Sequence, residues 1–296
     1  MSIFEEDQSF YKTGGELHYF KSEISEERFK YYSVKFIFMK VREALSGSFK
    51  ILREEPIFLL PMIIVVMLLG TMFGLYALAG FNPLVPETMV GTLPTWFLPA
   101  FSVFYIIMMV LSLLIQGMYP SMVKNHIEKR ELNLKDSLRF SYHKFWSLLG
   151  ANLLVALVAV AVILVITIPS TLLLVYTQNP AVMIGMIIAM IVVAVLLTVF
   201  FYYIYPAIIM DNMKAVAGFR KSIEVAKKNY LFTLLIVLIS TAIGYAVYGI
   251  FMGLPMYLGA AIYIFILSLV IGLIIVLFIG TWVAIIGPYA YYNIRT

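Results

Sequence analysis

The chain of 296 residues is too apolar for a soluble globular protein, because 62% of its residues are hydrophobic and only 12% are charged. In soluble domains about half of the residues are apolar and about a quarter are charged. The absence of cysteine excludes disulfides, thiolate metal sites and a cysteine nucleophile. The net charge of +5 is compatible with a nucleic-acid partner. The positions of the basic residues along the chain indicate which partner this charge favours.

The N-terminal segment, residues 1–37, is polar and charged. It lacks the apolar stretch of a cleavable signal peptide, so we expect it to remain as a cytoplasmic segment. From residue 38 to residue 296 the apolar residues come in long blocks. Such blocks predict an all-α integral membrane domain.

Six of these blocks are long enough to cross a membrane, for which a helix needs about 20 apolar residues. The predicted spans cover roughly 56–80, 95–119, 147–172, 181–206, 231–253 and 261–287. None of them contains Asp, Glu, Lys or Arg, so no charge opposes their insertion. The turn-forming residues 177–180 separate the third span from the fourth and make a hairpin of the two.

Basic residues occur in alternate connections only. Nine Lys or Arg precede the first span, six lie between the second and third, five between the fourth and fifth, and one follows the sixth. The other three connections, 81–94, 176–180 and 253–260, contain none. Because basic segments stay in the cytoplasm, both termini are predicted to be cytoplasmic. The net positive charge then faces anionic lipid headgroups rather than nucleic acid.

An amphipathic stretch precedes each odd-numbered span, at about 36–55, 134–145 and 216–230. The apolar side chains at helical spacing are Phe38, Val41, Leu45, Phe49 and Leu52, then Leu134, Leu138, Tyr142 and Phe145, then Val216, Phe219, Ile223 and Tyr230. Lys and Arg occupy the remaining faces. We predict three interfacial helices that lie with the apolar face toward lipid.

The three stretches also align with one another. Each contains a serine: Ser48, Ser137 and Ser222. Each even-numbered span ends near a proline: Pro120, Pro206 and Pro288. The spacings from serine to proline are 72, 69 and 66 residues. The sequence therefore predicts three hairpin repeats, at about 38–125, 126–212 and 213–296.

The three prolines are candidate helix breaks or hinges. A proline lacks a backbone N–H and leaves the carbonyl four residues earlier without its helical partner, which bends or ends a helix. At the cytoplasmic exit of a span the freed carbonyl reaches water, so simple punctuation explains the pattern. The alternative is that the prolines are the hinges of a gate or pore.

Three segments carry a resemblance to a known family: residues 44–56 (ALSGSFKILREEP), residues 205–212 (YPAIIMDN) and residues 217–222 (AGFRKS). They resemble a superfamily of prokaryotic six-helix membrane proteins. That superfamily includes the membrane domain attached to some glycerophosphoryl diester phosphodiesterases. The resemblance covers about 40–296 and implies the fold and a prokaryotic cell-membrane location. It does not imply phosphodiesterase activity, because the sequence leaves no room for the catalytic barrel.

Catalytic and metal-binding patterns are missing from the sequence. The three histidines, His18, His126 and His143, have no metal-ligand spacing. No ionisable side chain lies within a span to transfer a proton or activate a serine. We therefore expect no enzymatic activity, no cofactor and no metal.

Four polar residues are candidates for a pocket that faces the cytoplasm. Gln116 and Asn152 are the most polar side chains within the spans and lie near the cytoplasmic ends of adjacent helices. Asp211 is the first charge after the fourth span and is followed by Asn212. The alternative is a structural cluster with an ion pair at a helix end.

Two functions fit these features. The first is a non-enzymatic membrane scaffold, lipid-interacting or assembly module that meets the bilayer, a protein partner or a second copy of itself. The second is a permease or channel for a neutral or lipid-like solute, whose path would be lined by the hydroxyls and amides of the spans. A nucleic-acid partner is not expected, because the basic residues follow the membrane surface.

Overall fold

The computed structural model describes residues 26–80, 94–253 and 262–295. The chain divides into two units, Met1–Glu43 and Ala44–Thr296. In the first unit the described residues form the beginning of a helix, in which the Lys40 ammonium lies 4.6 Å from the centre of the Phe36 ring. A cation at this distance is attracted by the aromatic face. The second unit contains the six spans and is the subject of the following paragraphs.

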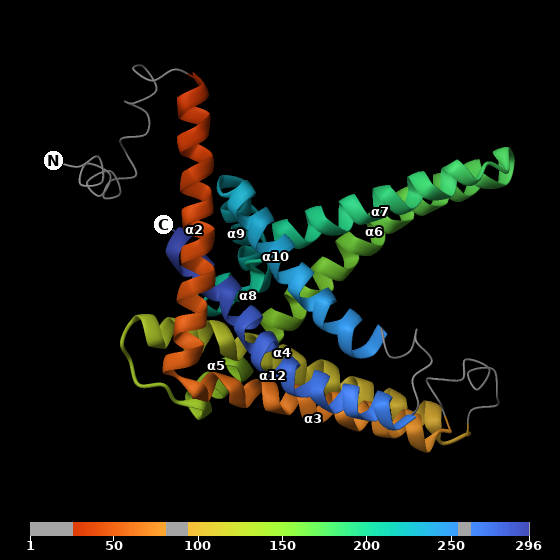
Figure 1. Ribbon diagram of the computed structural model, residues 1–296, viewed down its shortest axis with the longest axis horizontal. Coiled ribbons are helices and arrows are strands. Elements are labelled where there is room, and N and C mark those ends of the chain that lie inside the picture. Colours follow the sequence, from red (N-terminus) through yellow and green to blue (C-terminus); the bar gives the residue numbers. More distant parts are fainter. Residues whose placement is uncertain (1–25, 81–93, 254–261, 296) are drawn as a thin grey trace. The chain divides into compact units, whose positions relative to one another are not determined.

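Every regular element that the structure describes is a helix (Figure 1). In chain order these are α2 (Glu26–Glu54), η3 (Pro56–Phe58), α3 (Leu59–Leu78), α4 (Phe97–Ile127), α5 (Leu134–His143), α6 (Phe145–Thr177), α7 (Pro180–Phe201), α8 (Ile204–Met210), α9 (Ala215–Lys228), α10 (Tyr230–Tyr248), η5 (Gly249–Gly253) and α12 (Ile262–Ile294). The all-α prediction is confirmed for these residues. Most of the predicted connections 81–94 and 253–260, and His18 in the N-terminal segment, lie outside the described residues.

Six stretches of the described helices are long and apolar enough to cross a membrane. They are Pro56–Tyr76, Phe97–Ile127, Phe145–Thr177, Pro180–Met210, Tyr230–Phe251 and Ile266–Ile294. Each of them overlaps one predicted span, so the prediction of six is confirmed. The chain is a multi-pass membrane protein, and its apolar outer surface requires a lipid bilayer.

The second and sixth spans continue beyond the residues at which they were expected to end. α4 runs through Pro120 to Ile127, and α12 runs through Pro288 to Ile294. A proline in a helix removes one hydrogen bond and crowds the carbonyl four residues earlier. Both prolines are buried among neighbouring helices, and this packing offsets the missing bond. The expected ends at 119 and 287 are therefore several residues too early.

The fourth span is interrupted four residues before its proline. α7 ends at Phe201 and α8 begins at Ile204, because the ring of Pro206 crowds the carbonyl of Tyr202. Ser222 of α9 replaces the helical hydrogen bonds lost at the break. Its hydroxyl accepts a hydrogen bond from the Tyr203 backbone N–H at 3.1 Å and donates one to the Phe200 carbonyl at 2.7 Å.

The three predicted interfacial helices correspond to α2, α5 and α9. The first of them begins at Glu26, well before residue 36. Each helix turns small residues toward the protein: Ala44 and Ser48 in α2, Ser137 and Ser141 in α5, and Gly218, Ser222 and Ala226 in α9. Each also leaves larger apolar side chains exposed, among them Phe49, Leu138, Tyr142 and Val216. Part of the apolar sequence pattern thus faces away from the protein, while Phe219 packs on Phe201 and Phe49 lies against Trp282.

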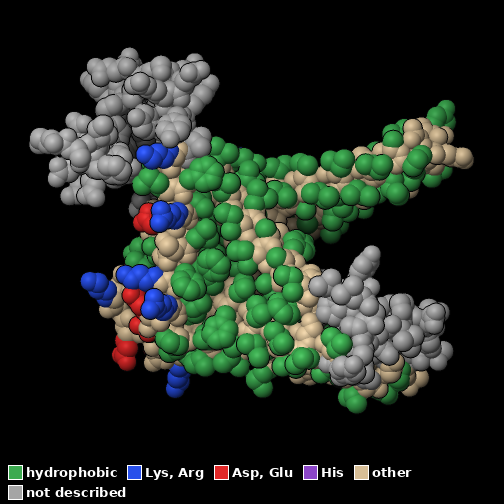
Figure 2. Space-filling model, viewed as in Figure 1, with side chains coloured by type: hydrophobic (Ala, Val, Ile, Leu, Met, Phe, Trp, Pro, Cys, Tyr) green, Lys and Arg blue, Asp and Glu red, His purple; other side chains and the backbone are tan. Residues whose placement is uncertain are grey.

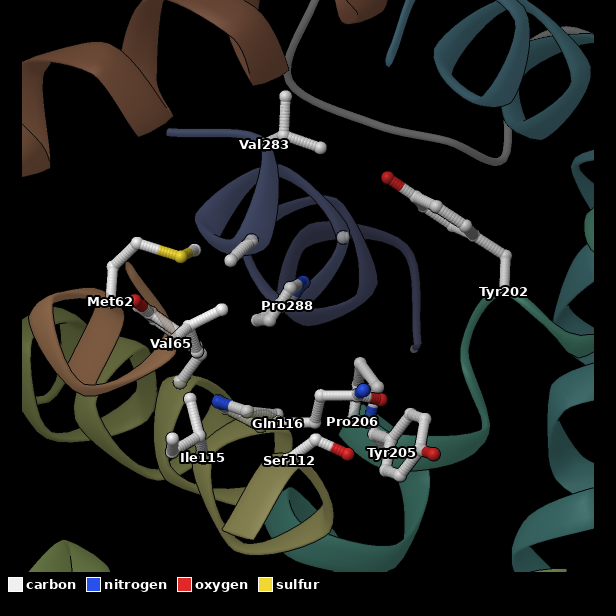
Figure 3. A pocket seen from close by; sticks show the side chains of 14 residues that line it. Met62, Val65, Ser112, Ile115, Gln116, Tyr202, Tyr205, Pro206, Val283 and Pro288 are labelled. Atoms are coloured by element: carbon white, nitrogen blue, oxygen red, sulfur yellow. The ribbon is translucent and has the colours of Figure 1, made fainter. Parts of the chain in front are cut away.

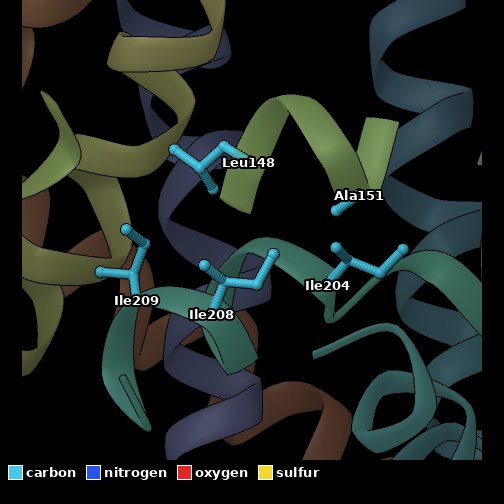
Figure 4. Packing of buried hydrophobic residues seen from close by; sticks show 5 residues of the cluster. All are labelled: Leu148, Ala151, Ile204, Ile208 and Ile209. Carbon is cyan, nitrogen blue, oxygen red and sulfur yellow. The ribbon is translucent and has the colours of Figure 1, made fainter. Parts of the chain in front are cut away.

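A cluster of buried aliphatic side chains joins the start of α6 to α8 (Figure 4). Leu148 and Ala151 come from α6, and Ile204, Ile208 and Ile209 come from α8. All five are at most 3% exposed. The short helix after the break is therefore held by close packing, since seven residues are too few for a helix that is stable by itself.

Buried residues concentrate at one end of the spans, which we call the proline end. It consists of residues 44–58, 112–151, 199–237 and 281–295. At the other end, α6 and α7 run together away from the remaining spans of this unit (Figure 1). Only 6% of their most apolar 18-residue window is buried, compared with 22% in α12. On the face shown in Figure 2, charged side chains lie along α2 and around α5 and the loop before it, while the spans are covered by hydrophobic side chains.

Candidate functional site

A cavity of about 380 Å³ lies at the proline end (Figure 3). It is lined by Met62, Val65, Ser112, Ile115, Gln116, Tyr119, Pro120, Tyr202, Tyr205, Pro206, Val283, Ala284, Gly287 and Pro288. These residues come from α3, α4, α8, α12 and the break between α7 and α8. All three of the prolines singled out in the sequence therefore meet at one site. The volume is within the range of small-ligand sites, about 300–1,000 Å³.

Each proline is accompanied in the cavity wall by the residue four positions earlier. These partners are Gln116, Tyr202 and Ala284. In a regular helix the backbone carbonyl of each would accept a hydrogen bond from the residue that is here a proline, and a proline has no N–H to donate. Residues i and i+4 share one face of a helix, so the freed carbonyl lies on the same side as the proline ring. The cavity wall thus includes three residues whose carbonyls lack the helical donor.

The other polar groups of the wall are uncharged. They are the hydroxyls of Ser112, Tyr119, Tyr202 and Tyr205 and the amide of Gln116. No Asp, Glu, Lys, Arg or His is present among the described residues that line the cavity. The Tyr119 hydroxyl is buried and makes no hydrogen bond within the part of the chain that the structure describes. In Figure 3, Pro288 lies between Met62 and Val65 on one side and Tyr202 on the other.

The structure brings two of the four predicted pocket residues to this cavity. Gln116 lines it directly and is exposed. Asn152 of α6 lies behind the wall, where its Oδ1 accepts a hydrogen bond from the Tyr205 hydroxyl at 2.9 Å. Asn152 therefore holds a tyrosine that lines the cavity, because this bond fixes the position of the ring.

Asp211 and Asn212 do not line the cavity. Asp211 accepts hydrogen bonds from the Tyr291 hydroxyl and from Arg295 Nη1, the latter at 2.8 Å. Asn212 adopts the left-handed conformation with φ of 55°, which is common just after the end of a helix. Both residues thus belong to the turn that closes α8, and Asp211 connects this turn to α12 through Tyr291.

Two lysines bind the carbonyls of this turn. Lys124 of α4 donates to the Met210 carbonyl at 2.7 Å, and Lys144 donates to the Asn212 carbonyl at 3.0 Å. Cations are favourable at a helix C-terminus, where carbonyls lack helical partners. Burial, and then repulsion by the nearby Lys214, lower the pKa of the Lys144 ammonium. The turn after α8 is therefore the point at which α4, α6 and α12 are joined by polar contacts.

A second, smaller hollow lies next to the cavity. It has a volume of about 160 Å³ and is lined by Gly244, Val247, Val276, Ile279, Gly280 and Val283. Its walls are entirely apolar and come from α10 and α12. Val283 lines both spaces. The polar cavity is thus adjacent to an apolar one that lies further along the spans.

The three aligned serines are all fully buried, with at most 1% exposure. Ser48 accepts a hydrogen bond from Trp282 Nε1 at 3.0 Å, and Ser222 bridges the break before α8 as described above. Ser48 therefore connects α2, which precedes the first span, to the sixth span. Ser222 connects α9, which precedes the fifth span, to the fourth span. The hydroxyl of Ser137 is also buried but makes no hydrogen bond with the described residues.

The tyrosines of the cavity wall were not predicted as site residues. Aromatic residues near the ends of spans commonly mark the membrane interface, so Tyr202 and Tyr205 carry no specific signal of a site by their type alone. Their positions relative to the proline distinguish them, since Tyr202 is four residues before Pro206 and Tyr205 is directly before it. The same offsets in the other even spans give residues that also line the cavity.

No group of three or more side chains suited to bind a metal is found among the described residues. A family model described as a domain of unknown function (DUF7847) matches residues 39–287. The match includes every residue of the cavity wall except Pro288. No curated protein and no solved structure matches the chain.

Proposed function

The chain belongs to the family with the domain of unknown function DUF7847, and from that premise we propose that it is a lipid-interacting membrane module. It holds an amphiphile from the bilayer in the cavity at the proline end. The module acts without catalysis, as a scaffold or assembly unit in a prokaryotic cell membrane. The resemblance of residues 40–296 to the six-helix superfamily supports this fold-level assignment and adds no activity to it.

The observation that carries the proposal is the convergence of the three prolines on one cavity. The sequence places these prolines at the exits of three different spans, and each meets the same space of about 380 Å³. A wall of apolar side chains with a few uncharged polar groups is typical of a ligand site. In a bilayer, the amphiphile present at highest concentration around this site is lipid.

The proline end is proposed to face the cytoplasm, together with both termini. The basic residues of three connections gather at this end, where Lys124 and Lys144 bind the turn after α8 and Arg295 pairs with Asp211. Segments rich in Lys and Arg stay in the cytoplasm. The exposed apolar side chains of α5 and α9, such as Tyr142 and Val216, would then contact lipid at the cytoplasmic interface.

The three hairpins are proposed to be repeats arranged in a ring. α5 packs on α4, and α9 packs on α7 and α8. The final turns of α2 meet α12 through the hydrogen bond of Ser48 with Trp282. Each of these helices thus packs on the even-numbered span of another hairpin, and the contact of α2 with α12 closes the ring. Such a cyclic pattern explains why the three prolines surround one space.

The absence of catalysis is proposed from the chemistry of the wall. General acid–base catalysis needs a titratable side chain within hydrogen-bond reach of the substrate. The described residues of the cavity wall offer no carboxylate, imidazole or amine, and the three tyrosine hydroxyls are the only titratable groups among them. Assays of the purified chain for hydrolysis of phospholipids and glycerophosphodiesters are therefore expected to give no activity above that of a mock preparation.

Retention of lipid tests the proposal directly. The full chain, purified from membranes in mild detergent, is expected to carry one lipid when its mass is measured under native conditions. Ala284→Phe fills the cavity and should remove most of the bound lipid. Ala194→Phe makes the same change on the exposed surface of α7 and should retain it. Equal retention by both variants, or no bound lipid in any sample, would contradict the proposal.

The orientation has its own test, which the cysteine-free sequence makes simple. Glu131→Cys places a thiol in the exposed loop before α5, and Tyr176→Cys places one at the tip of the α6–α7 hairpin, where the side chain is 89% exposed. A membrane-impermeant maleimide is expected to label Tyr176→Cys in intact cells and Glu131→Cys only after permeabilisation. The reverse pattern would show that the proline end lies outside.

A permease or channel is the second candidate. The apolar hollow beside the cavity favours it, because the two spaces together extend along α12. Uptake of a labelled neutral solute into vesicles that contain the protein would support this function. If Ala284→Phe abolished such uptake while Ala194→Phe preserved it, transport would replace the holding of lipid as the main function.

A further inference from the structure

We propose that the cavity and the adjacent hollow together bind one neutral glycerolipid with a free hydroxyl, of the diacylglycerol class. The hydroxyl end occupies the cavity between the prolines, and one hydrocarbon chain enters the apolar hollow between α10 and α12. This inference rests on the proposed lipid-binding function and specifies the class of lipid. Three properties of the two spaces lead to it.

The first property is the presence of three carbonyls that lack their helical donors. The prolines leave the carbonyls of Gln116, Tyr202 and Ala284 without their helical donors, and all three residues line the cavity. A carbonyl that a ligand covers loses its contact with water, so a ligand that donates a hydrogen bond to it gains over one that does not. A free hydroxyl supplies such a donor without a charge, whereas phosphate oxygens only accept and the ammonium donor of phosphatidylserine is charged.

The second property is the absence of charge. The described residues of the wall include no acid and no base, so nothing there would pair with a phosphate or an ammonium group. The nearest basic groups described above are already engaged, with Lys124 and Lys144 on the turn after α8 and Arg295 on Asp211. Moving an unpaired charge out of water is strongly unfavourable. A neutral headgroup is therefore favoured over a charged one.

The third property is the position of the apolar hollow. Its wall contains two glycines, Gly244 and Gly280, and no polar side chain. Gly244 is exposed and a Cβ built on it meets no atom within 4 Å, so the hollow is open toward the surrounding lipid at this residue. Val283 borders both the hollow and the cavity. A ligand with a small hydroxyl head and a hydrocarbon tail fits these two adjacent spaces, one polar and one apolar. Free glycerol has no hydrocarbon tail to occupy the apolar hollow.

The test uses the full chain in phosphatidylcholine vesicles with a photoreactive diacylglycerol as the probe. Competitors are unlabelled dioctanoylglycerol, dioctanoyl-phosphatidylserine and glycerol. Gly244→Leu fills the hollow, and Gly185→Leu is its matched control, because a Cβ at Gly185 also meets nothing within 4 Å but lies on the exposed α7. Pro288→Ala restores the backbone N–H that can bond the Ala284 carbonyl and so removes one free acceptor.

Dioctanoylglycerol is expected to suppress the labelling of cavity peptides at a concentration at least tenfold below that of dioctanoyl-phosphatidylserine. Gly244→Leu should reduce labelling at least fivefold and Gly185→Leu less than twofold. Pro288→Ala should reduce it about threefold while raising the thermal stability of the protein, a combination that misfolding cannot produce.

Other results would overturn the inference in distinguishable ways. Equal competition by dioctanoyl-phosphatidylserine would refute the neutral headgroup and leave lipid binding intact. Competition by glycerol at the same concentration would refute the role of the hollow. If no lipid probe labels the cavity peptides above the level of the α6–α7 surface, the proposed function fails together with this inference.

Discussion

The proline end and the α6–α7 hairpin differ in how their glycines are used. At the proline end, a Cβ on Gly47 would lie 2.4 Å from the Tyr289 hydroxyl, and a Cβ on Gly218 would lie 2.5 Å from Ile208 Cγ1. Gly185 in the hairpin meets nothing within 4 Å. Small residues at close helix contacts allow strong packing in membranes, where the hydrophobic effect does not drive helices together. The same residue type therefore marks a packed contact in one region and a lipid-facing surface in the other.

Polar side chains show the same contrast. In the hairpin, Thr167 and Thr198 donate to carbonyls of their own helices. At the proline end, Ser222 and Asp211 connect different helices. Contacts between helices thus hold this protein together over only a short part of the length of its spans. The remaining length is left to lipid, so substitutions should have effects that depend on the region more than on the residue type.

The largest effect is expected from Gly218→Val. The new side chain would collide with the buried Ile208 and separate α9 from α8. Overpacking of this kind lowers stability by about 2–3 kcal/mol. The free energy of unfolding in mixed micelles is the measurement, and Gly185→Val is the control, with a change expected below about 0.5 kcal/mol. Equal losses in both variants would remove the distinction between the two regions.

Ser222→Ala comes next. It leaves the Tyr203 N–H and the Phe200 carbonyl without partners in a buried place, which lowers the free energy of unfolding by about 2 kcal/mol. Thr167→Ala removes only a bond to the residue's own helix and should change it by about 0.5 kcal/mol or less. Faster proteolysis between α7 and α8 in Ser222→Ala would show that the break itself loosens. No difference between the two variants would mean that the serine does not hold the break.

Asp211→Asn is expected to have an intermediate effect. Both partners of its pair with Arg295 are about one-fifth exposed, so water weakens the attraction only in part. The change should lower the free energy of unfolding by about 1–2 kcal/mol. A double-mutant cycle with Arg295→Gln isolates the pair, because the second substitution should have little effect once the first is present. Simple additivity would show that the two side chains act independently.

The smallest effect is expected from Trp282→Phe. It removes the hydrogen bonds from Nε1 to Ser48 and to the Leu45 carbonyl but retains an aromatic ring beside Phe49. The expected loss is about 1 kcal/mol. Trp146→Phe, at an exposed site, should have no measurable effect. A loss as large as that of Gly218→Val would indicate that the contact of α2 with α12 dominates the stability.

The spans could be predicted from the sequence because length and apolar composition alone determine whether a helix crosses a bilayer. The ends of the spans could not. A proline predicts a missing hydrogen bond, yet whether the helix continues depends on the packing around it. Pro120 and Pro288 lie within continuous helices, whereas Pro206 follows a break. Ser222 forms hydrogen bonds with the backbone groups at the break. It belongs to a different helix, so the local sequence does not reveal this contact.

The candidate site was predicted in part for a similar reason. Gln116 was selected because it is polar within a span, and it lines the cavity. Asp211 was selected for its charge, which is used in a contact with Arg295 instead. The prolines were predicted to be helix breaks or the hinges of a gate or pore, without a prediction that they line one cavity. Their convergence depends on how the hairpins pack, and one sequence without structure does not contain that arrangement.

The hydrogen bond between Trp282 and the Leu45 carbonyl links positions 237 residues apart, so it forms late in the synthesis of the chain. The end of α2 leaves the ribosome first, and the span on which it docks leaves last. Until then the buried serine of α2 and the glycine beside it, Gly47, have no surface to cover them. In a truncated product that face stays uncovered by α12, and only a chain with all of its spans inserted conceals it. The contact of α2 with α12 thus forms only after the last span has been inserted.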